Sequence, residues 1–266
     1  MDFIIIAIAV LIASGLTFFS GFGLGTIMLP VFSLFFDLPT AVGATAIIHL
    51  ANNVFKFGMV HKYIHFQTLF RFGIPALIFA AIGGMLLSYF SDLGPYANYT
   101  IGMKNFNMTL VGTTIGSLMI FFAWFDLDPR FKKLKITNKH LPFGGALSGF
   151  FGGVSGHQGA FRSAFLSKSG LTKEQFIGTS NAVSLVVDIT RLTMYLFVAN
   201  KLSQHDNHFL AALTDAKSLL IVGIVFAFLG TYFGKKMVQK TTIIGIRKII
   251  GVLLFLMGGL MIAGVL

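Results

Sequence analysis

Ten apolar runs separated by polar or Pro/Gly breaks restrict this chain more than any other feature of its sequence. They fall at about 3–19, 22–36, 40–60, 68–90 and 107–125, and again at about 141–154, 158–170, 174–199, 213–237 and 243–265. A spanning helix needs roughly 20 apolar residues, and lipid-exposed sheet edges would leave backbone groups unpaired. The chain is 55% hydrophobic and 11% charged, which is too apolar for a water-soluble domain of this length. The sequence therefore predicts an all-α polytopic membrane protein.

The chain also contains a second copy of part of itself, in a gapless register with an offset of 135 residues. Identical residues recur at Ser20/Ser155, Gly21/Gly156, Gly43/Gly178, Leu50/Leu185 and Met59/Met194, and Thr45/Ser180, Asn53/Asp188 and Lys56/Arg191 are similar. The repeat predicts one transmembrane transporter domain over 1–266, with five segments in each of two pseudo-repeats at 1–128 and 136–266. In each half the first two segments are short and interrupted by glycines, so we expect broken helices or re-entrant hairpins there.

Lys and Arg residues crowd the loops around 126–140 and 235–248. The positive-inside rule places both loops in the cytoplasm, and the termini and the loops at 91–106 and 200–212 on the other side. The two halves then have opposite topology, as in transporters that alternate access around a midplane site by rocking one half against the other. We assign most of the net charge of +11 to these loops facing anionic lipids, and we expect no nucleic-acid partner.

Polar residues form one face of the third segment in each half. His49, Asn52, Asn53 and Lys56 have i, i+3, i+4 and i+7 spacing, and their counterparts are Asn181, Ser184, Asp188 and Arg191. A charge in the hydrocarbon costs about 3 kcal/mol. Hydrogen bonding between helices explains the Asn and Ser residues, but it does not account well for Asp188 and Arg191. We expect Lys56 and Arg191 to flank a central anion site, although snorkelling to the interface is an alternative for both. Asp188 is the candidate for proton coupling, with a structural ion pair to Arg191 as the alternative.

The glycine-rich breaks at 20–25 and 152–159 supply a second ingredient of an anion site. Unwound glycines expose N–H groups at the start of a short helix, which attracts anions; tight helix packing is the alternative explanation. Arg162 lies one turn into the helix that follows the second break. The candidate substrate-binding residues are Ser20, Gly21, Gly23, His49, Asn52, Asn53, Lys56, Ser155, Gly156, His157, Gln158, Arg162, Ser163, Ser180, Asn181 and Arg191.

Over nearly its whole length the chain resembles the TauE/SafE sulfite-exporter family of bacterial inner-membrane permeases. The resemblance is carried by Gly21, Gly23, Gly25 and Pro30 in one half and by Gly152, Gly153, Gly156 and Gly159 in the other. It implies transport of small sulfur-containing anions such as sulfite, sulfoacetate or other organosulfonates, and we expect export as the direction, with uptake as the alternative. The second motif departs from the family pattern, because the position equivalent to Pro30 is Phe165. In addition, Gln158, Arg162 and Ser163 are available to shape the pocket. The sequence leaves the anion, the direction, the coupling ion and the oligomeric state open.

Two alternatives come from other function classes. An uptake permease or a channel for a small anion would fit the same pattern. The string at 153–156 resembles the nucleophile motif of rhomboid intramembrane serine proteases, which need a His base in a later membrane helix. After His157 only His205 and His208 follow, both in a polar loop, and the repeat explains Ser155 through Ser20. We therefore expect no enzyme, no cofactor and no metal, and as partners a small anion, lipids and, as an open option, further copies of the chain.

Overall fold

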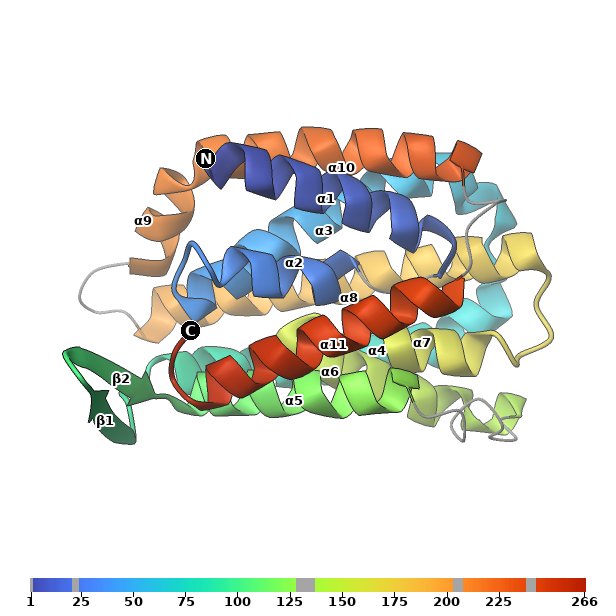
Figure 1. Cartoon of the computed structure of the whole chain (residues 1–266). Coiled ribbons are helices and arrows are strands. Elements are labelled where there is room, and N and C mark those ends of the chain that lie inside the picture. The colour runs from blue at the N-terminus through green and yellow to red at the C-terminus, as the bar shows by residue number, and fades with distance from the viewer. Residues whose placement is uncertain (1, 21–23, 128–136, 203–207, 238–242) are drawn as a thin grey trace.

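The molecule is a bundle of helices with a two-stranded hairpin at one end (Figure 1). The computed structural model describes residues 2–20, 24–127, 137–202, 208–237 and 243–266. The helices of the first half are α1 (Asp2–Ser20), α2 (Leu24–Phe32), α3 (Leu38–Val60), α4 (Phe66–Ser91) and α5 (Leu110–Leu127). Those of the second half are α6 (Leu141–Ser155), α7 (Gly159–Leu166), α8 (Lys173–Leu202), α9 (His208–Asp215), α10 (Lys217–Met237) and α11 (Ile243–Ile262). Short 3-10 turns, η1 (His61–Tyr63) and η3 (Asn138–His140), precede α4 and α6.

Every predicted apolar run contains one of these helices. Among the described residues, the stretches Phe66–Ser91, Lys173–Val198 and Lys217–Gly234 are long and apolar enough to cross a bilayer. The predicted all-α polytopic membrane fold is thereby confirmed. Local signals set several boundaries: Asp37 caps α3 by accepting a hydrogen bond from Thr40 N at 3.3 Å, with Pro39 in its first turn, as expected for a helix start.

The glycine breaks produce two helices that are too short to span the membrane. α2 has nine residues and contains Pro30, and α7 has eight. At 1.5 Å per residue they are about 13 Å and about 12 Å long, against a hydrocarbon core of roughly 30 Å. α6 ends at Gly156, whose φ of 78° is left-handed, a conformation that glycine adopts without strain. The first segment differs from its prediction, since α1 is a continuous helix of 19 residues.

Among the described residues, glycines bring three pairs of helices into backbone contact, as is common in membrane helices. A Cβ at Gly145, Gly149 or Gly153 of α6 would clash with a backbone carbonyl of α4. Gly15 of α1 meets Gly230 and Gly234 of α10 in the same way, and Gly116 of α5 meets Gly258 of α11. Each pair takes one helix from each predicted half.

The termini, α9 and the hairpin lie at one end of the bundle, on the left in Figure 1. η1, η3 and the connection between α7 and α8 lie at the other end. We call these the terminal end and the basic end. The terminal end carries the exposed Asp37, Asp92, Lys104, Asp215 and Lys217, and the charged side chains at the other end are Lys62, Arg71, Lys139, Lys168, Lys173 and Glu174. The basic loops at 128–136 and around 238–242 lie wholly or partly outside the described residues.

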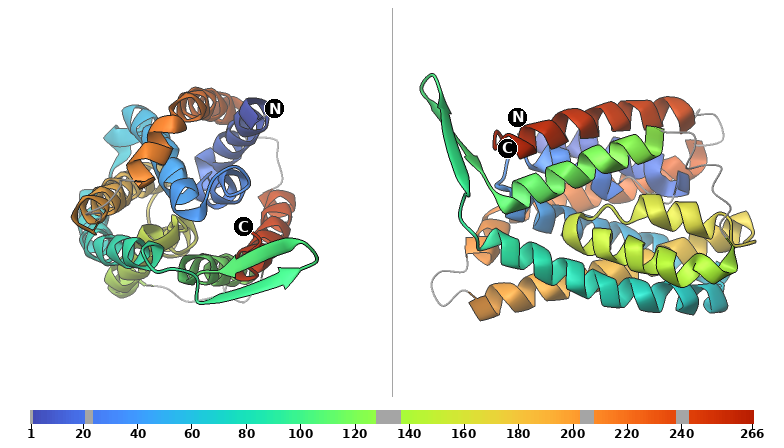
Figure 2. Two further views of the ribbon diagram at one scale, coloured as in Figure 1. Left: turned by 90° about the vertical axis from the view of Figure 1, so that its left-hand side faces the viewer. Right: turned by 90° about the horizontal axis from the view of Figure 1, so that it is seen from below.

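The hairpin was not predicted. β1 (Ala97–Ile101) pairs with β2 (Lys104–Met108) in antiparallel register, where Tyr99 stands opposite Phe106 with their rings stacked 5.2 Å apart. Figure 2 shows it projecting beyond the helices. The two-residue turn begins at Gly102, with φ of 62°, which is typical of tight hairpins. Tyr99 OH donates to the carbonyl of Ala263 and fastens the hairpin to the C-terminal segment. The apolar run expected from 107 therefore begins as a helix only at Leu110.

Candidate functional site

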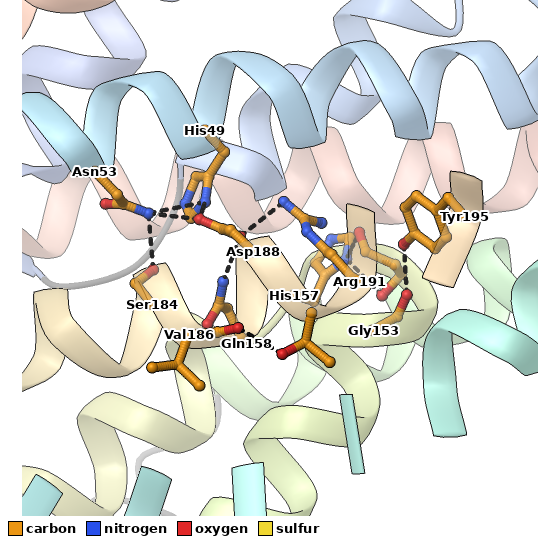
Figure 3. Close-up of polar contacts among 12 residues, drawn as sticks. His49, Asn53, Gly153, His157, Gln158, Ser184, Val186, Asp188, Arg191 and Tyr195 are labelled. Carbon is orange, nitrogen blue, oxygen red and sulfur yellow. Dashed lines mark hydrogen bonds and ion pairs between the residues drawn. The ribbon is translucent and has the colours of Figure 1, made fainter. Parts of the chain in front are cut away.

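A fully buried carboxylate, Asp188 of α8, has partners on α3, in the second glycine break and on α8 itself (Figure 3). His49 Nδ1 lies 2.6 Å from its Oδ2, and Asn53 Nδ2 donates to the same oxygen at 2.7 Å. Gln158 Nε2 donates to Oδ1 at 2.9 Å, and Arg191 Nη2 lies 3.0 Å from Oδ1 as an ion pair. A charge survives burial only when it is paired and hydrogen-bonded, and both oxygens of Asp188 are engaged.

The contacts at this crossing of α3 and α8 follow the internal repeat. Asn53 and Asp188 are equivalent under the offset of 135 residues, and they are hydrogen-bonded to each other. His49 is equivalent to Ser184, so the contact of His49 with Asp188 is the counterpart of the 2.9 Å hydrogen bond from Asn53 Nδ2 to Ser184 Oγ. Equivalent residues touch each other in this way beside a two-fold axis. The polar stripes predicted on the two helices therefore meet face to face.

Arg191 is the largest side chain that is fully buried among the described residues. A Cβ at Gly156 would lie 2.5 Å from its Nη1, so its guanidinium packs directly on the second glycine break. Nε, Nη1 and Nη2 make no hydrogen bond within the described part of the chain, because the contact with Asp188 meets only the distance criterion for an ion pair. Buried donors are nearly always satisfied. Arg191 therefore presents a planar set of donors for which an acceptor is still needed.

The start of α2, in the first half of the chain, also contacts the second glycine break. A Cβ at Gly25 of α2 would lie 3.2 Å from Gly156 O and 3.8 Å from His49 Cδ2. The start of α2 and the end of α6 thus touch next to Arg191, as expected for two broken helices that meet at one site. Gly21 and Gly23 lie outside the described residues, and Ser20 ends α1 with a side chain that is outside them as well.

A second cation, Arg162 of α7, extends the network. It is 4% exposed, its Nε donates to Ser180 Oγ at 2.8 Å, and its Nη1 donates to Gln158 Oε1 at 2.7 Å. Gln158 in turn donates to Asp188, so one amide links the two charges. Asn181 Nδ2 donates to Asn53 Oδ1 at 3.1 Å, which brings this predicted residue into the same network.

The charge of the described cluster is unbalanced. Lys56 is 9% exposed and experiences both the like charge of Arg162 and the opposite charge of Asp188. Lys56, Arg162 and Arg191 are buried basic side chains, whereas Asp188 is the buried acid at the centre of the network. A small anion between these groups would reduce the excess positive charge in a region of low dielectric constant.

Several predicted residues face elsewhere. Asn52 Oδ1 accepts from Thr231 Oγ1 of α10 at 2.6 Å, so this amide joins α3 to α10. His157 stacks on Phe122 at 5.4 Å, and its Nδ1 lies 3.0 Å from Ser155 Oγ. Ser163 is only partly buried on α7. Among the residues that the structure describes, no group of three His, Cys, Asp or Glu side chains could hold a metal.

The candidate list omitted three residues that take part in these contacts. Ser184 belongs to the polar stripe and accepts from Asn53. Tyr195 lies one turn beyond Arg191 on α8 and donates to the carbonyl of Gly153 (Figure 3); its i+4 spacing from Arg191 was the available signal. Thr231 is a polar residue within an apolar helix, which was the only sequence sign of its bond to Asn52.

Comparison with known proteins gives one family match. A family model described as Sulfite exporter TauE/SafE matches residues 5–261, a range that includes both glycine breaks and the crossing of α3 and α8. Searches of curated proteins and of solved structures gave no match.

Proposed function

The chain belongs to the sulfite exporter TauE/SafE family, and we propose that it is a secondary transporter exporting small sulfur-containing anions across the bacterial inner membrane. Its substrate class is sulfite, sulfoacetate or other organosulfonates. The observation that carries the proposal is Arg191, a buried guanidinium whose three nitrogens make no hydrogen bond within the described residues. Sulfur oxyanions carry several acceptor oxygens that match the planar fork of arginine, whereas the single point charge of lysine would not fix their orientation.

Alternating access between inverted repeats explains why the site has one cation on each side. If the two halves exchange conformations during transport, each contact converts into its counterpart under the 135-residue offset. The contacts among His49, Asn53, Ser184 and Asp188 convert into one another and persist. The ion pair of Arg191 with Asp188 converts into an approach of Lys56 to Asn53, so Arg191 is released in the opposite state while Lys56 takes its place near the anion.

Asp188 is the proposed coupling residue. It holds Arg191 at 3.0 Å and His49 at 2.6 Å, so a proton on this pair would weaken the hold on the guanidinium. The anion then competes with the carboxylate for Arg191, and proton and anion occupancy are linked. The proposed orientation puts the basic end in the cytoplasm, with the terminal end facing the periplasm.

Thermal stability of the purified protein tests the proposal most directly. A ligand at 100 times its dissociation constant stabilises the folded state by about 2.7 kcal/mol. We expect sulfite or an organosulfonate to raise the unfolding midpoint, and the zwitterion taurine and chloride to have smaller effects. Arg191→Gln should abolish the shift, whereas Lys139→Gln, a change at an exposed basic residue, should leave it intact. A full shift in the Arg191 variant would place the site elsewhere, and flux in oriented proteoliposomes would decide the direction.

A further inference from the structure

A cavity of about 70 Å³ lies between α3, α4 and α8 near the terminal end of the bundle. Its wall includes Leu87, Ser88, Ser91 and Asp92 of α4, together with Tyr195 of α8. One water molecule needs roughly 10–15 Å³ on this measure, so the cavity has room for several. Two hydroxyls and a carboxylate give those waters partners, and we therefore treat the cavity as wet.

Tyr195 both lines this cavity and interacts with Arg191. Its side chain is 4% exposed, and its hydroxyl donates to the carbonyl of Gly153 on α6 (Figure 3). Gly153 lies three residues before Gly156, the glycine on which Arg191 packs. Along α8, Tyr195 is four residues from Arg191, which is about 6 Å of helix. The phenol ring therefore links α8 to α6, interacts with Arg191 and also lines the cavity.

We propose that this cavity is the outward vestibule of the anion route, and that Tyr195 is the gating residue between the vestibule and Arg191. The proposal rests on the proposed function and adds to it a path and a barrier. The Tyr195 hydroxyl donates to the carbonyl of Gly153 and also interacts with the Arg191 side chain, so rotation of Tyr195 would expose Arg191 to the vestibule.

The charge of the vestibule suits release of an anion. Asp92 contributes to the wall, and the described lining residues include no Lys or Arg. An anion that passes Tyr195 leaves a region of excess positive charge for one with a negative side chain, so it does not accumulate there. This polarity agrees with export through the terminal end.

The absence of cysteine from the sequence makes single-cysteine labelling the sharpest test. In right-side-out vesicles, an impermeant methanethiosulfonate reagent bearing a sulfonate is added from the outside. We expect Ser88→Cys in the vestibule to react readily. Ser155→Cys, at a position that is 1% exposed beside Gly156, should react slowly with Tyr195 in place and at least tenfold faster when Tyr195→Ala is added. Ile82→Cys, on the exposed apolar face of α4, is the lipid-facing control and should stay slow in every background.

Tyr195→Phe keeps the ring and removes only the hydroxyl, so it guards against misfolding of the alanine variant and should give an intermediate rate at Ser155→Cys. If Ser88→Cys does not react, or if the labelling rate of Ser155→Cys is the same with Tyr195, Tyr195→Phe and Tyr195→Ala, the proposed vestibule and gate are wrong. Sulfite should also slow labelling of Ser155→Cys in the Tyr195→Ala background. Failure of this protection alone, with the other labelling rates as expected, would count against the proposed function and leave the vestibule and its gate in place.

Discussion

A buried guanidinium needs acceptors, and the position of Arg191 is fixed by the smallest residue available on the facing segment. Gly156 adopts φ of 78° and lies so close that a Cβ would stand 2.5 Å from Nη1. Two requirements therefore coincide at one position: a left-handed backbone that ends α6, and space for the arginine head. The pattern of Lys, Arg and Asp within apolar runs made Arg191 and Asp188 visible in the sequence, because buried charges are costly enough to need a reason.

Partners across helices could not be predicted in the same way. Gln158 stands in a glycine-rich break, and nothing in the sequence says that its amide reaches Asp188. Asn52 and Asn53 are neighbours, yet one bonds Thr231 and the other Asp188, because a helix turns by 100° per residue and the packing decides which faces meet. Tyr195 reads from sequence as an ordinary interfacial aromatic.

Gly156→Ala should abolish anion-induced stabilisation, because the added methyl group displaces the Arg191 guanidinium. The left-handed backbone adds a general loss of about 1–3 kcal/mol in stability. Gly170→Ala is the matched control, since Gly170 has the same φ of 78° with nothing within 4 Å of the added Cβ. Thermal melts with and without sulfite separate the two effects: both variants should melt earlier, and only Gly170→Ala should still respond. A normal sulfite response in Gly156→Ala would remove Arg191 from the site.

Asp188→Asn should leave the cations of the cluster without their central acid. We expect the ligand-free protein to lose stability, on the order of 3 kcal/mol for a broken buried pair, and a bound anion to recover more of it than in the parent chain. Flux in proteoliposomes should lose its response to an imposed pH gradient. An unchanged pH profile would make Asp188 a structural partner of Arg191 and assign the driving force to another gradient.

Helices α3 and α8 cross each other, and each half of the chain contributes one of them. Their hydrogen-bonded pair, Asn53 and Asp188, occupies equivalent positions of the repeat. Helix locations and the two short helices could be predicted from apolar runs and glycine breaks. The hairpin and α9 were missed because a search for membrane segments treats everything between them as a loop, although alternation in 97–101 and Gly102 were available as signals.

Exchanging the two equivalent side chains tests this crossing. Asn53→Asp alone puts two carboxylates within hydrogen-bonding distance and should lower the unfolding midpoint strongly. The double variant Asn53→Asp/Asp188→Asn moves the acid from α8 to α3 and should recover most of the loss, with a coupling energy of about 1–3 kcal/mol. Additive losses would show that the pair does not lie on a shared axis. The recovered protein should also favour Lys56 over Arg191 as the partner of the acid.

At the scale of the whole molecule, the termini and the hairpin lie at one end, and most of the basic side chains of the described residues outside the bundle interior lie at the other. Cysteines introduced at Met103, fully exposed at the tip of the hairpin, and at Lys139, exposed in η3, should react with an impermeant thiol reagent from opposite sides of the membrane. Labelling of whole and permeabilised cells measures this. Reaction of both from the same side would contradict the inverted topology and the transport cycle built on it.

The glycine contacts between helices indicate which helices of the bundle can move relative to one another. α4 is held against α6, and α1 against α10, where glycines bring the two backbones into direct contact. Sliding one helix of a pair along the other would cause backbone clashes, so we expect each pair to move as a rigid unit. Each of these units consists of one helix from each half of the sequence. If the protein alternates between two states, we therefore expect the moving bodies to be mixed pairs of helices and not the two halves of the sequence, with the hydrogen-bonded contacts of His49 and Asn53 to Ser184 and Asp188 lying where α3 and α8 meet.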